Sequence, residues 1–279
     1  MTTDGMPRVH ALRRGVPGRL PLVLLHGFPL DHRMWHDVTD LLPGEPTVLA
    51  VDLPGFGASP SGPDVAQALG ADPAPSLEVM ADGVAAALRG QGVERAVVAG
   101  LSLGGYVAMA LVERHPDLVA GLGLIDTKAT ADDDAARRTR LEVAAQVRAE
   151  MRVDRVLGMR TTLLGATNRV TRPDLSERLE RWTRDQGPLG LAWAQEAMAA
   201  RPDRTQALRA YAGPAVVVVG EEDELSPVAA SQHMVDALAD ARLVVVPGAG
   251  HMTSNESPEP VASALQGLLA RAQRADAAA

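Results

Sequence analysis

The chain has 279 residues, of which 46% are hydrophobic and 22% are charged, so it can bury one sizeable core and is not expected to be disordered. Its formal net charge of −8 argues against a nucleic-acid-binding protein, which needs clustered basic residues. The absence of cysteine excludes disulfides, thiolate metal sites and a cysteine nucleophile. Because neither a signal-like N-terminus nor an apolar run of about 18 residues occurs, we expect a cytoplasmic protein that does not enter a membrane.

Short apolar runs rich in β-branched residues alternate with longer helix-like segments. This alternation predicts an α/β fold with a mostly parallel sheet flanked by helices, whose strands are buried on both faces. The region Val9–Arg14 and its neighbours could add strands but is too polar to assign. The predicted strands are Leu22–Leu25, Thr47–Val51, Ala96–Ala99, Leu122–Ile125, Ala215–Val219 and Leu243–Val246.

Helical patterns fill the intervals between these strands. Ser76 is a good N-cap for a helix over Leu77–Arg89. The run Tyr106–Val112 is apolar on every side and is therefore expected to be a buried helix. The stretch Ala58–Pro75 is rich in Ala, Pro, Gly and Asp and shows little periodicity, so we expect it to be a surface excursion.

Residues 127–209 interrupt the alternation because helix-forming residues dominate and no strand-like run occurs. We therefore expect a helical cap, or lid, inserted into a core domain made of residues 1–126 and 210–279. From Lys128 to Arg204 the insertion carries 15 basic and 12 acidic residues, whereas the remainder carries 12 and 23. The arginines are expected to pair with acids on solvated helix faces, although attraction of an anionic substrate is the alternative. Four residues could line a pocket under the cap or simply pack in it, namely Trp182, Trp193, Met159 and Met198.

The segment Gly100-Leu101-Ser102-Leu103-Gly104 fits the G-x-S-x-G pattern between a predicted strand and a predicted helix. A nucleophilic serine on such a turn needs a strained backbone, and the flanking glycines remove Cβ atoms that would clash. The helix N-terminus beyond Ser102 offers free N–H groups to an oxyanion, and Leu103 N–H is the natural first donor.

A serine hydroxyl needs a base, and that base needs a group that fixes its tautomer. Of the seven histidines, His251 is the best base because it follows the last predicted strand in a loop of small residues. The histidines at 10, 32, 36, 115 and 233 lie in contexts more typical of the surface.

Several segments together resemble the α/β-hydrolase family from about Leu20 to Leu269. They are the Gly100–Gly104 turn, His26-Gly27-Phe28-Pro29 and Asp52-Leu53-Pro54-Gly55-Phe56-Gly57. The resemblance implies that Phe28 donates the second oxyanion N–H, that His26 is structural and that Asp52 shapes a turn. It also implies that Asp223, in a G-x-x-D-x-x-x-P turn, is the acid, with Asp126 as the alternative. Glu221, Glu222 and Glu224 are then solvated turn charges.

Within the family, the serine motif and Pro247–Met252 look most like carboxylesterases and 3-oxoadipate enol-lactone hydrolases. The predicted function is hydrolysis of a small ester or lactone, without metal or other cofactor, and we expect neutral esters to be preferred. The alternatives are a cofactor-free haloperoxidase or perhydrolase, a carbon–carbon bond hydrolase and a non-catalytic ligand receptor. The sequence determines neither the physiological substrate nor the oligomeric state.

Overall fold

The computed structural model describes residues 5–158 and 160–278. Its sheet has seven strands in the order β1-β3-β2-β4-β5-β6-β7, with β1 antiparallel to β3 and every other pair parallel. This arrangement confirms the predicted fold class. The strands are β1 (Val9–Arg13), β2 (Leu22–Leu25), β3 (Val48–Val51), β4 (Ala96–Leu101), β5 (Val119–Ile125), β6 (Ala215–Gly220) and β7 (Ala241–Val246).

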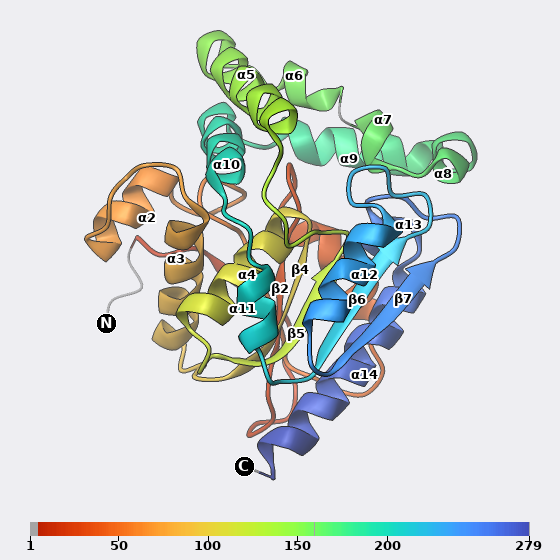
Figure 1. Ribbon diagram of the computed structural model, residues 1–279. Helices are drawn as coiled ribbons and strands as arrows, with labels where there is room; N and C mark the ends of the chain where they lie inside the picture. Colours follow the sequence, from red (N-terminus) through yellow and green to blue (C-terminus); the bar gives the residue numbers. More distant parts are fainter. Residues whose placement is uncertain (1–4, 159, 279) are drawn as a thin grey trace.

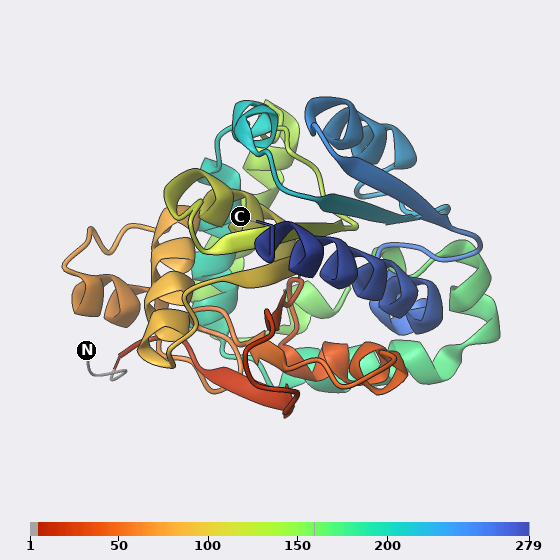
Figure 2. The ribbon, with the colours of Figure 1, turned by 90° about the horizontal axis from the view of Figure 1, so that it is seen from below.

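Alternate residues of the central strands enter two separate cores. Val23 and Leu25 of β2 pack with α3 and α4, whereas Leu22 and Leu24 pack with α1 and α14. Figure 2 shows these two sets of helices on opposite sides of the sheet. The central strands are therefore buried on both faces, as their continuous apolar runs predict.

The helices that cover the sheet agree with the strongest sequence signals. Ser76 accepts a hydrogen bond from Val79 N at 3.1 Å and caps α3, and α4 contains the apolar run predicted as a buried helix. The helices outside the 127–209 segment are η1 (His32–Trp35), α1 (His36–Leu41), α2 (Gly62–Leu69), α3 (Leu77–Gly90), α4 (Leu103–Arg114), α12 (Val228–Ala237), α13 (Thr253–Glu256) and α14 (Pro258–Asp276).

The chain between β5 and β6 folds into helices, and no strand occurs in its described residues. Figure 1 shows α5 to α10 gathered above one end of the sheet, whereas α11 lies beside the sheet. The bounds are α5 (Asp134–Glu150), α6 (Asp154–Leu157), α7 (Arg160–Leu163), α8 (Ala166–Thr171), α9 (Pro173–Arg184), α10 (Pro188–Ala200) and α11 (Thr205–Ala210).

One expectation from the sequence is wrong and another is incomplete. β7 was expected to be buried on both faces, but it lies at the edge of the sheet and most of its residues are partly exposed. The excursion at 58–75 contains the helix α2, which Ser61 caps by accepting a hydrogen bond from Asp64 N and which ends at Gly70 with φ of 68°. Within the described residues, no helix is both long enough and apolar enough to cross a bilayer.

Candidate active site

Ser102 lies on a tight turn between β4 and α4. Its backbone has φ 51° and ψ −110°, a strained conformation for a residue with a Cβ. A Cβ at Gly100 would lie 2.1 Å from the Gly104 carbonyl oxygen, and one at Gly104 would lie 2.1 Å from that of Leu25. The two glycines are therefore required by the close backbone approaches that make the turn possible.

The structure brings Ser102, His251 and Asp223 together in one hydrogen-bonded row. His251 Nε2 lies 2.9 Å from Ser102 Oγ, and His251 Nδ1 lies 2.8 Å from Asp223 Oδ2. The other carboxylate oxygen of Asp223 accepts hydrogen bonds from the N–H groups of Leu225 (2.8 Å) and Ser226 (2.9 Å). Because these N–H groups fix the carboxylate, Asp223 can in turn fix the orientation of the imidazole.

Asp126, the alternative acid, occupies a different position. Its Oδ1 accepts a hydrogen bond from Gly220 N at 3.0 Å, and its Oδ2 accepts bonds from Thr253 N (3.0 Å) and Thr253 Oγ1 (2.6 Å). Gly220 precedes the Asp223 turn and Thr253 follows His251. Asp126 therefore ties together the two loops that carry Asp223 and His251, while its own carboxylate makes no hydrogen bond to His251.

The buried surroundings change the pKa values of His251 and Asp126. Burial alone would lower the pKa of His251, but the charge of Asp223 and its hydrogen bond raise that pKa above the usual 6.5. Burial, reinforced by the nearby charge of Asp223, raises the pKa of Asp126 to about 7. Asp223 is thus placed to stabilise a protonated imidazole, which any proton transfer from Ser102 would create.

The two predicted oxyanion donors flank Ser102. A Cβ at Gly27 would lie 3.7 Å from the Ser102 Cβ, so the loop that carries Phe28 passes directly beside the serine. Leu103 is the first residue of α4. Among the described residues, no acceptor is bonded to the N–H of Phe28 or of Leu103. Both groups are therefore available to a ligand at Ser102.

His26 holds the Phe28 loop in place. Its Nε2 accepts a hydrogen bond from Leu53 N at 2.9 Å, so the proton of the neutral ring is on Nδ1, which lies 3.1 Å from the Gly27 carbonyl oxygen. Complete burial lowers the pKa of His26 and keeps the ring neutral. Its two nitrogens are occupied by the backbone, which fits the structural role that the sequence resemblance implies.

A cavity of about 250 Å³ opens onto Ser102 and His251. Met198 lines it, as one of the four candidate residues of the helical segment. Trp182 instead stacks against the guanidinium groups of Arg33 and Arg178, and Trp193 packs against Gly62. Met159 lies outside the described residues. The full lining is Phe28, Ser102, Tyr106, Lys128, Asp132, Ala136, Arg140, Leu163, Met198, Glu224, Leu225, Ser226 and His251.

Sequence reasoning missed a buried glutamate that positions the His251 loop. Glu256 Oε1 accepts hydrogen bonds from the N–H groups on either side of His251, Gly250 at 2.9 Å and Met252 at 3.1 Å. Its Oε2 accepts a bond from Gly165 N at 2.9 Å, in the helical segment. The only signal in the sequence is a carboxyl five residues after the histidine, at the end of α13, and it matches no known pattern.

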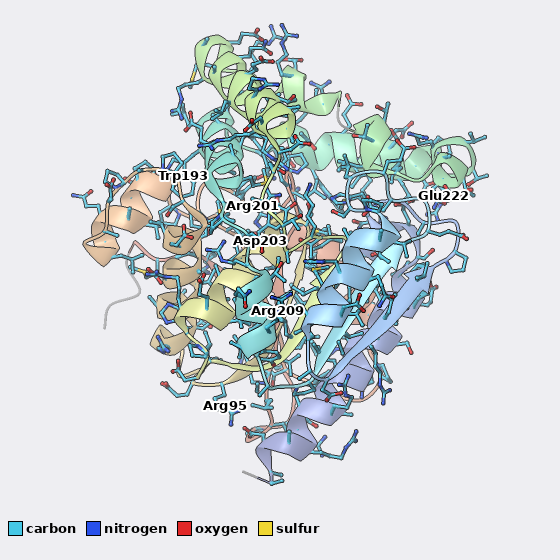
Figure 3. The ribbon with its side chains drawn as sticks, in the orientation of Figure 1. Arg95, Trp193, Arg201, Asp203, Arg209 and Glu222 are labelled. Atoms are coloured by element: carbon cyan, nitrogen blue, oxygen red, sulfur yellow. The ribbon has the colours of Figure 1, made fainter. Side chains whose placement is uncertain are left out.

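Glu222 also differs from its expected role as a solvated turn charge. It accepts hydrogen bonds from both the N–H and the hydroxyl of Thr167 in α8, and these bonds lower its pKa. Figure 3 shows Glu222 beside α8. The loop that follows β6 therefore anchors the helical segment as well as carrying Asp223.

One group of described residues, His10, His32 and Asp52, has the composition of a metal site. Each histidine places a ring nitrogen 2.8 Å from a different Asp52 oxygen, and the two rings are stacked with centroids 3.6 Å apart. Asp52 also accepts hydrogen bonds from His32 N and Ala58 N, each at 2.9 Å. Because lone pairs of stacked rings run parallel rather than converging, we interpret the cluster as a hydrogen-bonded brace for the turn at 52–58.

Comparisons with known proteins identify the family of this chain. A family model described as the alpha/beta hydrolase family matches residues 22–264. The pimeloyl-[acyl-carrier protein] methyl ester esterase of Aromatoleum aromaticum is 30% identical, over 90% of this chain and 98% of its own length. The 2-succinyl-6-hydroxy-2,4-cyclohexadiene-1-carboxylate synthase of an Enterobacter species is 31% identical, over 92% and 94%.

The chain spans about half (46%) of another relative, the biotin biosynthesis bifunctional protein BioHC of Cellvibrio japonicus, at 31% identity over 88% of this chain. Among solved structures, a thermophilic esterase from Thermogutta terrifontis with malate bound superimposes with a TM-score of 0.87. That protein is 33% identical, and the match covers 98% of this chain and 97% of the esterase.

Proposed function

This chain belongs to the alpha/beta hydrolase family, and we propose that it is a serine hydrolase that cleaves small carboxylic esters or lactones through an acyl-enzyme. The observation that carries the proposal is the hydrogen-bonded row from Ser102 through His251 to Asp223, which opens into a cavity. Carboxylesterase or lactonase activity is the finer part of the proposal. It is supported by the names of the relatives, several of which are ester hydrolases.

In the first half of the reaction Ser102 is the nucleophile and His251 the base. The Nδ1–H of His251 donates a hydrogen bond to Asp223, and this leaves Nε2 free to act as the base. Nε2 accepts the Ser102 hydroxyl proton as Oγ bonds to the substrate carbonyl carbon. The carbonyl oxygen becomes an oxyanion and accepts hydrogen bonds from Phe28 N–H and Leu103 N–H. Each such donor is worth about 3–4 kcal/mol of transition-state stabilisation in comparable enzymes.

The same groups complete the cycle. Collapse of the tetrahedral intermediate breaks the ester bond, and protonated His251 gives its proton to the leaving alkoxide, which departs as an alcohol. Water then enters, gives a proton to His251 Nε2 and attacks the acyl carbon, so that the acid is released and Ser102 regains its proton. Asp223 keeps the imidazole in the required tautomer throughout and stabilises its charged form.

The helical segment 127–209 is proposed to act as a lid that forms the substrate pocket. Its residues Lys128, Arg140 and Met198 share a cavity with Ser102, and Glu222 and Glu256 bind it to the catalytic loops. A cavity of about 250 Å³ is smaller than the usual range for ligand pockets, which begins at about 300 Å³, and this favours short substrates. We further propose that the enzyme works in the cytoplasm on a small-molecule substrate.

A second candidate is a reaction in which His251 acts as a base on a substrate that is not an ester, because one relative is named as a synthase. A panel of short esters and lactones, assayed with and without hydrogen peroxide, tests the first proposal. We expect hydrolysis by the wild-type protein at rates well above a Ser102→Ala control. Failure to turn over any ester or lactone would contradict the proposal, and faster acyl transfer to peroxide than to water would favour the perhydrolase alternative.

A further inference from the structure

One wall of the cavity carries an unusual group of charges around Asp132. Its carboxylate, 1% exposed, contacts three cations. Arg201 Nη2 lies 2.7 Å from Oδ1, Arg140 Nε lies 2.6 Å from Oδ2, and Lys128 Nζ lies 3.5 Å from Oδ1. Burial alone would raise the pKa of Asp132, but the hydrogen bond from Arg201 and the charge of Arg140 hold it well below its usual range. The cluster therefore contains one anion and three cations.

Arg201 is the structural partner of Asp132. It follows α10 where the chain leaves the helices above the sheet, as Figure 3 shows, and its side chain is 2% exposed. Its guanidinium donates to the carbonyl oxygens of Met198 (2.9 Å) and Thr130 (3.2 Å) and stacks on Tyr106, 4.1 Å from the ring centroid. Because Arg201 already balances the charge of Asp132, the charges of Lys128 and Arg140 are in excess.

Lys128 and Arg140 have donors to spare, and both line the cavity with Ser102 and His251. Arg140 Nη1 donates to Gln195 Oε1 at 3.1 Å, whereas its Nη2 has no acceptor among the described residues. Lys128 has three N–H groups and one ion pair, at the long distance of 3.5 Å. The other acidic residue of the lining, Glu224, is 71% exposed and has Arg169 4.0 Å away. It does not neutralise the two cations at Asp132.

An excess of positive charge in a partly buried cavity is unfavourable unless an anion completes it. We propose that Lys128 and Arg140 form a carboxylate subsite, so that the preferred substrate is a small ester or lactone with a carboxylate on its acyl or alcohol part. The inference rests on the proposed hydrolase function and adds the substrate class. The carboxylate would accept hydrogen bonds from Lys128 Nζ and Arg140 Nη2 while the ester carbonyl lies at Ser102.

This inference reverses the preference for neutral esters expected from the sequence. Most arginines of the helical segment do pair with acids near the surface, among them Arg148 with Glu196 and Arg184 with Glu180. Lys128 and Arg140 differ because the carboxylate between them already has a buried partner. A carboxylate entering this cavity would meet two donors, so the cost of removing it from water is offset.

The test compares substrates that differ only in charge. Monomethyl succinate, glutarate and adipate are each matched with the corresponding neutral amide ester, and acetoxyacetate is matched with acetoxyacetamide to place the carboxylate on the alcohol side. Methanol or acetate release gives kcat/KM for each member of a pair. We expect at least one acid to exceed its amide by about tenfold or more, the effect of one or two hydrogen bonds to a charged group.

Three variants assign that preference to the subsite. Lys128→Met and Arg140→Gln should each reduce the ratio of kcat/KM for the acid to kcat/KM for its amide by about tenfold, with the larger loss on the acid. Arg148→Gln is the matched control. Arg148 lies on α5, as Arg140 does, but it pairs with Glu196 and does not line the cavity. This substitution should leave the ratio unchanged. Lys128→Met is the safer variant for folding, since the one ion pair that Lys128 makes among the described residues is long.

The outcomes separate this inference from the proposed function. Ser102-dependent hydrolysis of the amides with no preference for any acid would overturn the carboxylate subsite and leave the hydrolase proposal standing. If no ester is cleaved, the hydrolase proposal fails, and calorimetry with succinate, glutarate and adipate decides the subsite. Binding to the wild-type protein but not to Lys128→Met would support it, and equal or absent binding would overturn it.

Discussion

The two sides of the cavity are built by different physical means. On the sheet side, Ser102, Asp223 and His251 lie on short loops. The backbone N–H groups of the Asp223 and His251 loops donate buried hydrogen bonds to Asp126 and Glu256, and Thr127 Oγ1 donates one to the Ser102 carbonyl oxygen. On the helical side, Lys128, Asp132 and Arg140 are held mainly by contacts between long charged side chains. Backbone restraints allow little adjustment, whereas charged side chains can change partners.

This difference indicates that the sheet side carries the reacting groups and that the helical side determines which substrate is preferred. A nucleophile and its base must keep one geometry within a fraction of an ångström, so they are suited to strained turns and buried networks. A subsite that recognises one charge tolerates more movement. Substitutions on the sheet side should therefore lower turnover of every substrate, and substitutions on the helical side should change which substrate is preferred.

The largest expected effect is that of Ser102→Ala, which should lower kcat for every ester by at least about three orders of magnitude. The removed hydroxyl is the reacting group and contributes little to packing. Steady-state kinetics on a chromogenic ester measure the loss, and a thermal melt checks the fold. Appreciable activity in a folded Ser102→Ala protein would break the comparison, because the chemistry would then lie elsewhere.

The next effect separates the two buried aspartates. Asp223→Asn should lower kcat by about four orders of magnitude, because the amide no longer fixes the His251 tautomer or stabilises its charge. Asp126→Asn should lower kcat much less and act mainly on stability, since Asp126 bonds Gly220 and Thr253. Steady-state kinetics give kcat for both variants, and melting curves check that each variant is folded at the assay temperature. The opposite order would assign the role of third residue to Asp126.

The pH dependence of kcat/KM should sharpen the assignment of the base. His251 must be neutral to accept the serine proton, and its pKa is raised above 6.5, chiefly by Asp223 acting against burial. Activity should therefore fall as the pH decreases through a value above 6.5. The residual activity of Asp223→Asn should fall at a lower pH, because the charge that favours the imidazolium is gone. An unchanged profile in that variant would contradict the assignment.

The smallest effect concerns stability. Asp126 has a folded-state pKa of about 7 against a usual 3.8, so the folded protein retains a proton that the unfolded chain loses between these values. Its contribution to stability is therefore present below about pH 4 and lost as the pH rises toward 7. Between about pH 4 and pH 7, the Tm of the wild type should therefore fall relative to the Tm of Asp126→Asn. A constant difference would show that Asp126 does not titrate there.

The sequence predicted those parts of the fold and site that local sterics dictate. The glycines around Ser102 have no alternative at such close backbone approaches, and the continuous apolar runs correctly indicated strands. The edge position of β7 depends on which strands pair, which no single run reveals. The helix α2 was not predicted although Ser61 and Gly70 are ordinary boundary signals, because the segment around it is rich in Ala, Pro, Gly and Asp and shows little helical periodicity.

The charge cluster was beyond prediction for a different reason. Arg201 lies 69 residues after Asp132, and only the packing of α10 against α5 brings them together. The sequence therefore revealed an excess of basic residues without revealing which of them remain unbalanced. Glu256 was hidden in the same way, since its hydrogen bonds to Gly165 and Asn168 connect residues about ninety positions apart.

The most direct test of the central claim is covalent trapping of the nucleophile. A fluorophosphonate probe phosphonylates a serine only where a base activates its hydroxyl and an oxyanion site receives the phosphoryl oxygen. Incubation of the wild-type protein, followed by digestion and mass spectrometry, should locate a single adduct on Ser102. The Ser102→Ala and His251→Ala variants should remain unlabelled. An adduct on another serine, or no adduct on a folded protein that hydrolyses esters, would contradict the account.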